Sequence, residues 1–127
     1  MDGDDMTKTS AEVLFDFWSS FDLPAYDETS VPAKTPLPYI TYETADDAFG
    51  NEIALTASVW YRDSSWATIT RKANTIKAAI GRGGRMLRTD NGALWLKRGT
   101  PFAQRMSDTD DSVRRIVINY TVEFIEN

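Results

Sequence analysis

Two adjacent segments decide the fold: Asn51-Glu-Ile-Ala-Leu-Thr-Ala-Ser-Val-Trp-Tyr61 and Trp66-Ala-Thr-Ile-Thr-Arg-Lys-Ala-Asn-Thr-Ile-Lys-Ala-Ala-Ile80. In the first, apolar side chains alternate with polar ones such as Glu52 and Ser58, which predicts a strand with one buried face. In the second, large apolar residues recur every three or four positions, which predicts a helix with one apolar stripe. Gly81 follows this helix, where a left-handed cap is favoured. A strand followed at once by such a helix is typical of a helix packed on a sheet.

An aromatic segment near the N-terminus predicts a second helix. Thr9-Ser-Ala-Glu12 has the spacing of a capping box, in which two side chains satisfy free backbone N–H groups at the helix start. Between Val13 and Phe21 one helical face carries Val13, Leu14, Phe17, Trp18 and Phe21, and Leu23-Pro24 ends the helix. A short helix this aromatic must be buried against a sheet or against another subunit.

The segment 24–38 contains four prolines among small polar residues. Each proline fixes φ and removes a backbone donor, so the segment predicts an extended linker within the domain, neither helix nor central strand. Beyond the central helix, Asn91-Gly92 predicts the tight turn of a β-hairpin, because these residues accept positive φ angles. The remaining segments are predicted as strands at 39–43, 85–90, 93–98 and 113–125, and as a loop at 99–111.

The predicted order of elements is therefore α-β-β-α-β-β-β. This order indicates an α+β fold with a single mixed or antiparallel sheet of about five strands and helices on one face. Such a sheet has exposed edges, which a monomer must protect and an oligomer can use. The 127 residues fit one domain, at 9–127, preceded by an acidic tail at 1–8 that we expect to be disordered.

The composition argues against catalysis, because the chain has no cysteine and no histidine. Thiolate nucleophiles, zinc–thiolate sites and the usual general base near neutral pH are all missing. The acidic run Asp108-Thr-Asp-Asp111 lacks the glycine and the distal glutamate of a calcium loop. We therefore predict no catalytic residue, no metal and no cofactor. An enzyme that works with carboxylates alone is the remaining catalytic alternative.

The sequence also bears on the protein's location. It has no apolar run of the roughly 20 residues that a membrane-spanning helix needs. Its first residues are acidic, whereas a signal peptide begins with basic residues and continues with apolar ones. We expect a protein made and used in the cytosol, or built into something assembled there, without a membrane partner.

Charge is unevenly distributed along the chain. Residues 1 to 50 hold eleven acidic and two basic residues, whereas residues 51 to 127 hold eight acidic and twelve basic residues. This asymmetry suits head-to-tail contact between identical subunits, because complementary patches steer association and fix its register. An acidic tail in front of a nearly neutral domain would give the same counts, so both interpretations stay open.

A basic stretch that begins at Gly81-Arg-Gly-Gly-Arg85 surrounds the predicted hairpin, with Trp95 among its cations. Arginine, glycine and an aromatic ring can bind nucleic acid through phosphate contacts and stacking. The glycines follow a helix, whereas those of a phosphate-binding loop precede one, so a helix cap plus a hairpin is favoured over a polyanion-facing surface, which stays open as the alternative. The residues that would face a polyanion are Arg82, Arg85, Arg88, Lys97, Arg98 and Arg105.

The aromatic residues indicate a second kind of surface. Trp60 and Tyr61 must point to opposite sides of their strand, so one of them needs cover from the N-terminal helix or from a neighbouring subunit. Tyrosine and tryptophan are favoured in the cores of protein interfaces. The residues predicted to contact another subunit are Phe17, Trp18, Phe21, Trp60 and Trp66.

The arrangement as a whole resembles a known family. The residues that carry the likeness are Pro38-Tyr-Ile-Thr-Tyr42, Ser58-Val-Trp-Tyr-Arg62, the helix of the form Trp66-x-x-Ile69-x-x-x-Ala73-x-x-Ile76, and the closing strand Ile116-Val-Ile-Asn-Tyr-Thr-Val-Glu-Phe124. In order and pattern, residues 10 to 125 resemble the tail terminator proteins of long-tailed bacteriophages, also called tail-to-head joining or minor tail proteins.

The resemblance implies a structural virion protein of the tail or neck, assembled in the host cytoplasm. Members form a homo-oligomeric ring, usually a hexamer, that caps the tail tube and offers its other face to the head connector, with DNA passing through the lumen. The basic stretch would then line the lumen or face the connector. The family has no catalytic residues to carry over. A small nucleic-acid-binding module that uses the basic hairpin 82–105 is the alternative function.

Overall fold

The structure, a computed structural model, describes residues 8–45 and 51–126. The predicted disordered tail at 1–8 lies outside the described residues, apart from Lys8. The chain forms two helices, α1 (Ser10–Ser19) and α2 (Ala67–Ile80), and a six-stranded sheet of order β1-β2-β3-β6-β5-β4. The strands are β1 (Ala25–Asp27), β2 (Tyr39–Tyr42), β3 (Glu52–Arg62), β4 (Arg85–Thr89), β5 (Gly92–Met106) and β6 (Val113–Glu126).

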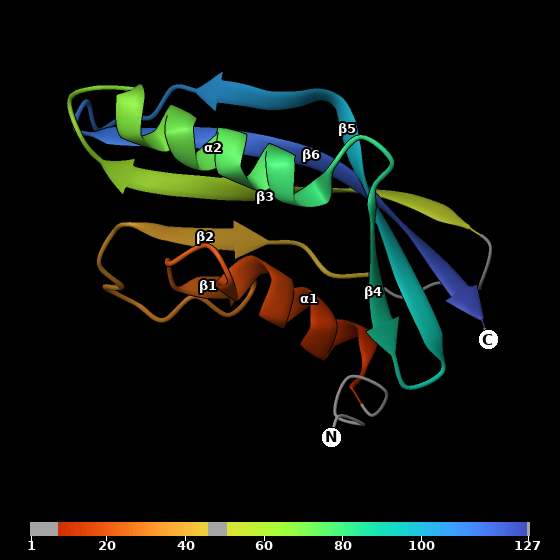
Figure 1. The fold of residues 1–127 in the computed structure, drawn as a ribbon. Coiled ribbons are helices and arrows are strands. Elements are labelled where there is room, and N and C mark those ends of the chain that lie inside the picture. The colour runs from red at the N-terminus through yellow and green to blue at the C-terminus, as the bar shows by residue number, and fades with distance from the viewer. Residues whose placement is uncertain (1–7, 46–50, 127) are drawn as a thin grey trace.

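The predicted fold class is confirmed, with six strands in place of about five. All neighbouring strands pair antiparallel except β1 and β2, so the sheet is mixed. The sheet curls, and α2 lies along β3, β6 and β5 while α1 lies between β1 and β4 (Figure 1). Both helices pack on the same face, because both contribute side chains to one hydrophobic core with the inward residues of the strands.

The additional strand, β1, falls within the segment predicted to be only a linker. Ala25 to Asp27 form a proline-free stretch between Pro24 and the later prolines, so their N–H groups can take part in pairing. The ends of this pairing are fixed by Ile40, whose N–H donates to the carbonyl of Pro24, and by Glu28, whose N–H donates to that of Tyr42. A three-residue edge strand is short, as edge strands often are.

The predicted loop at 99–111 is wrong for its first half, because β5 continues to Met106. Pairing with β6 is interrupted between Arg98 and Ala103, and Pro101 lies in this bulge, where its missing N–H costs no ladder bond. The side chain of Asn119 on β6 spans the interruption by donating to the Pro101 carbonyl at 2.8 Å and to Gln104 Oε1 at 3.0 Å. The strand thus resumes after the irregularity.

The helix ends follow the sequence closely. The capping box of α1 is confirmed, since the Thr9 hydroxyl accepts from the Glu12 N–H and the Glu12 carboxylate accepts from the Thr9 N–H. The helix ends at Ser19, because the Ser20 hydroxyl and N–H both donate to the Phe17 carbonyl. Gly81 ends α2 with φ of 78°, the positive φ that glycine allows, but its ψ of 167° differs from the left-handed helical cap that the sequence predicts.

The hairpin of β4 and β5 turns one residue earlier than predicted. Thr89 pairs with Gly92, so the two turn residues are Asp90 and Asn91. At this corner the Asp90 N–H donates to the carbonyl of Lys8, 2.8 Å away, and Gly92 pairs with Glu126 on β6. The start of α1 and the end of β6 therefore both lie beside the hairpin turn.

The core corrects part of the predicted subunit interface. Phe17, Trp18 and Phe21 are only 4%, 0% and 5% exposed, so they have almost no surface to offer to another subunit. The Trp18 ring stacks on Tyr42 and packs at 5.3 Å from the ring of Tyr120, both on the inward face of the sheet. The aromatic helix is covered by the chain's own strands, which was one of the two possibilities open from the sequence.

Candidate subunit interfaces

The structure does not bring the six predicted polyanion-facing residues into one patch. Arg98 is occupied inside the fold, since its Nε and Nη2 donate to the Lys77 carbonyl at 3.0 and 2.7 Å and so cap the end of α2. Lys97 lies between the carboxylates of Glu52 and Glu123, at 2.5 and 3.3 Å, and over the ring of Trp95. Both cations thus serve contacts within the chain.

We expect Arg98→Ala to lower the free energy of unfolding by about 1–2 kcal/mol, because it leaves the Lys77 carbonyl without its charged donor. Arg88→Ala is the matched control, since Arg88 is exposed and has no partner among the described residues. It should change stability by less than about 0.5 kcal/mol. Urea unfolding followed by circular dichroism measures both. Equal effects of the two substitutions would show that the cap at Lys77 contributes nothing.

Arg105 lies at the other end of α2, in a cluster with Trp66. The Arg105 guanidinium is 4.8 Å and the Arg114 guanidinium 5.3 Å from the centroid of the Trp66 ring. Arg114 is further fixed by donating to the Ser64 carbonyl at 2.9 Å. Trp66 is half-buried, so part of the ring stays available to a partner. The sequence predicted roles for Trp66 and Arg105 separately, and only the fold brings them together.

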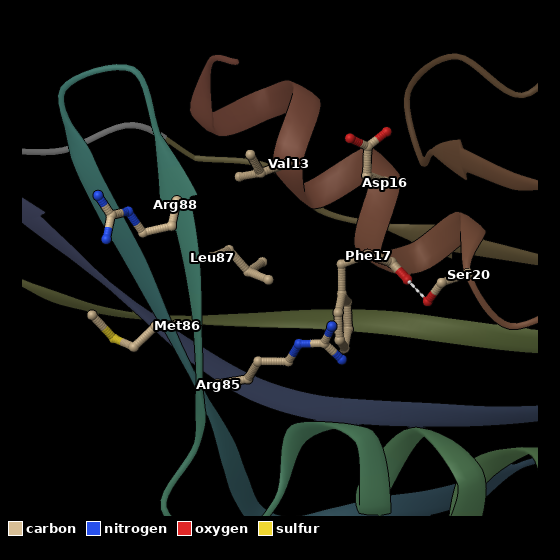
Figure 2. A pocket seen from close by; sticks show the side chains of 8 residues that line it. All are labelled: Val13, Asp16, Phe17, Ser20, Arg85, Met86, Leu87 and Arg88. Atoms are coloured by element: carbon tan, nitrogen blue, oxygen red, sulfur yellow. Dashed lines mark hydrogen bonds between the residues drawn. The ribbon is translucent and has the colours of Figure 1, made fainter. Parts of the chain in front are cut away.

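The other predicted cations, Arg82, Arg85 and Arg88, lie on or next to β4, at the open edge of the sheet. Between this edge and α1 is a groove with a cavity of about 280 Å³ (Figure 2). Figure 2 shows Leu87 and Arg85 pointing towards α1, and Met86 and Arg88 pointing away from it. We call this feature the β4 groove; its apolar lining is Val13, Phe17, Met86 and Leu87, and its polar lining is Asp16, Ser20, Arg85 and Arg88.

A group of aromatic rings lies on the sheet face opposite the helices. Tyr26, Tyr39 and Trp60 follow one another across three strands, with ring centroids 5.8 and 6.3 Å apart. The Arg115 guanidinium covers Trp60 at 4.5 Å, and the Trp60 Nε1–H donates to the Thr41 hydroxyl. All four side chains are half-buried, and we call them the aromatic surface. Trp60 is the residue predicted from the sequence; Tyr39 shares its face because the register places the two opposite each other.

Three carboxylates gather where β1 and β2 end. Asp27 accepts from the Thr44 hydroxyl, Glu43 accepts from the Thr56 N–H, and Glu28 follows Asp27 in the chain. Partial desolvation of its carboxyl, together with the negative charges of Glu43 and Asp27, raises the pKa of Glu28, although the residue is exposed at the surface. Within the described part of the chain, none of the three forms an ion pair with a basic side chain. We call Asp27, Glu28 and Glu43 the acidic corner.

Metal-binding clusters and membrane-spanning helices are both absent from the described residues. Residues 8–45 and 51–126 contain no group of three acidic side chains placed to hold a metal ion. None of their helices is long and apolar enough to cross a membrane. The features described above are the β4 groove, the acidic corner, the aromatic surface and the cluster of Arg105 and Arg114 around Trp66.

Comparison with known proteins adds one result about the fold. No protein-family model matches the chain, and no curated protein matches it. Among solved structures, a chain of "Virion of native gene transfer agent (GTA) particle" is similar, with 22% sequence identity and a TM-score of 0.52. The match covers 91% of this chain and 85% of that chain. The two chains therefore share a fold over nearly their whole lengths.

Proposed function

We propose that this chain is a non-enzymatic structural subunit of a phage-like virion. In this proposal it assembles into a homo-oligomeric ring, a hexamer, that caps the tail tube and joins it to the head connector. The observation that carries the proposal is the fold shared with a virion chain over 91% of this sequence. The order of elements that resembles tail terminator proteins agrees with it and supports the proposed position in the tail or neck.

The half-exposed aromatic rings on the surface support the proposal that neighbouring chains cover part of this subunit. The aromatic surface leaves Trp60 and its two tyrosines partly exposed, although such rings are preferred in interface cores. At the N-terminal end of α2, Trp66 is likewise half-exposed between two guanidinium groups. Trp60 and Trp66 thus remain the proposed contacts with neighbouring subunits, the tube or the connector, whereas Phe17, Trp18 and Phe21 support the fold from inside.

DNA contact in the lumen is a smaller part of the proposal. Because Lys97 and Arg98 are held by partners within the chain, contact with a polyanion is left to Arg82, Arg85, Arg88 and Arg105. These are spread over two ends of the sheet, which suits passive lining of a channel better than a dedicated nucleic-acid site. No observation favours the alternative of a small nucleic-acid-binding module.

The proposal is tested by light scattering and negative-stain imaging of the purified protein over a range of concentrations, with and without tail tubes. We expect rings at high concentration or on tube ends, and Trp60→Ala should weaken their formation. Phe15→Ala is the control, because Phe15 is an aromatic residue that is 49% exposed on α1, in the helical layer. A persistent monomer that never adds to a tube would contradict the proposal. Salt-sensitive DNA binding by that monomer, lost in Arg85→Ala/Arg88→Ala, would favour the nucleic-acid module.

A further inference from the structure

The two edges of the sheet carry opposite charge. Around β4, the exposed cations Arg85 and Arg88 line the groove and Arg82 lies in the turn before the strand, while the acidic corner lies at the edge formed by β1 and β2. Because the sheet curls around α1, this helix lies between the two edges (Figure 1). The charge asymmetry of the sequence thus becomes an asymmetry between two sides of one subunit.

The β4 groove has properties suited to binding an acidic surface of another chain. Its floor is apolar, and the Arg85 guanidinium lies 5.5 Å from the Phe17 ring centroid, which holds that charge at the rim. The nearby carboxylate of Asp16 is engaged by Lys8 at 2.7 Å, so it leaves the charge of the arginines largely uncompensated. Met86 is 50% exposed beside them. As an edge strand, β4 also has backbone N–H and C=O groups on its outer side.

The acidic corner has the properties of the complementary surface. Its carboxylates lack a basic ion-pair partner among the described residues, and Glu28 is exposed at the end of β1. These carboxylates repel one another, and a cation that approaches them stabilises their charged forms. Because α1 separates the corner from the groove within one subunit, the two surfaces do not cover each other. Each is therefore available to the complementary surface of another copy.

From these observations we infer that the β4 groove of one copy receives the acidic corner of the next copy. Arg85 and Arg88 then face Glu28 and its neighbours across the subunit boundary, and Met86 is covered. In that arrangement, contact with DNA in the lumen is left to Arg82 and Arg105. A contact that uses two different surfaces of the same chain is heterologous, and repeating it closes a ring when the rotation allows. The inference rests on the proposed ring and specifies which surfaces form the contact between neighbouring subunits. We call this contact, between the β4 groove of one copy and the acidic corner of the next, the joint.

Complementary charge reversals test the inference. Arg88→Glu and Glu28→Arg should each weaken self-association about tenfold or more, because each places like charges across the joint. An equal mixture of the two variants should assemble again, because their alternation restores opposite charges at every boundary. Arg71→Glu makes the same charge change on the exposed side of α2 and should leave assembly unchanged. Light scattering of each variant and of the mixture gives these results.

Cross-linking provides a second test that does not depend on charge. Because the chain has no cysteine, Met86→Cys combined with Ser30→Cys introduces the only thiols, one beside the groove and one next to the acidic corner. A short bis-maleimide should join copies into a ladder of oligomers under denaturing electrophoresis. Met86→Cys with Asn74→Cys, which places the second thiol on α2, should give far fewer links.

The outcomes separate this inference from the proposed function. Rings of the wild-type protein that tolerate both charge reversals and give no ladder would overturn the joint described here, while leaving the ring in place. Failure of the wild-type protein to form rings under any condition would overturn the ring and the joint together. Rings that are lost in both variants and recovered in the mixture would establish the joint.

Discussion

Trp18→Ala is expected to lower the free energy of unfolding by about 3–5 kcal/mol, the range for removing a large aromatic side chain from a protein core. Trp18 is fully buried, and its ring contacts Phe17, Phe21, Tyr42 and Tyr120. The substitution therefore leaves a cavity between α1 and the sheet, where the surrounding rings can collapse only in part. Thermal and urea unfolding followed by circular dichroism measure the loss.

Two further substitutions sharpen this prediction. Phe15→Ala removes an aromatic residue from the same helix, but its side chain is 49% exposed, so stability should change by less than about 0.5 kcal/mol. Trp18→Phe should be much milder than Trp18→Ala, because it keeps an aromatic ring and removes an indole N–H that has no hydrogen-bond partner among the described residues. A loss below about 1 kcal/mol in Trp18→Ala would mean that α1 is not anchored by this ring.

Gly84→Ala is the second substitution for which we expect a large effect. It should lower the free energy of unfolding by about 2–4 kcal/mol. Gly84 has φ of 86°, a conformation that is unfavourable for any residue with a Cβ. A Cβ there would also lie 2.6 Å from both the Leu96 carbonyl oxygen and Trp95 Nε1, so the start of β4 would have to move away from β5. Strain and overpacking act together at this position.

The neighbouring glycine provides a matched control for this effect. A Cβ on Gly83 would meet no atom within 4 Å, and its backbone is not in the left-handed region, so Gly83→Ala should be close to neutral. Denaturant unfolding of both variants at the same temperature gives the comparison. Equal stability of the two would show that the turn between α2 and β4 can rearrange freely.

The sequence predicted the fold well where periodicity was strong. The alternation in residues 52–62 and 113–126, the apolar stripe of α2 and the capping box at Thr9 all correspond to observed elements. Strand β1 was missed because three residues between prolines carry no periodic signal, and its pairing depends on the distant β2. The continuation of β5 past Pro101 was missed because proline usually ends a strand, and a bulge supported by Asn119 cannot be predicted from local composition.

The surfaces could be predicted only in part, because each depends on strand register. The burial of Trp18 follows from the position of α1 over Tyr42 and Tyr120, which are 24 and 102 residues away in the chain. Likewise, Arg98 and Arg88 look alike in the sequence, yet one caps α2 and the other is exposed at the edge. The acidic corner had no signal of its own, since Asp27 and Glu43 meet only through the pairing of β1 with β2.

The meeting of the two ends of the described chain at one hairpin has a practical consequence. Asp90 is bonded to Lys8 and Gly92 pairs with Glu126, so a fluorescent label placed at residue 8 or residue 126 lies at the same corner of the subunit (Figure 1). This corner adjoins β4, so a bulky label attached at either of these two residues lies close to the groove. Labels intended to leave the groove unobstructed belong on the exposed side of α2, for example at Asn74.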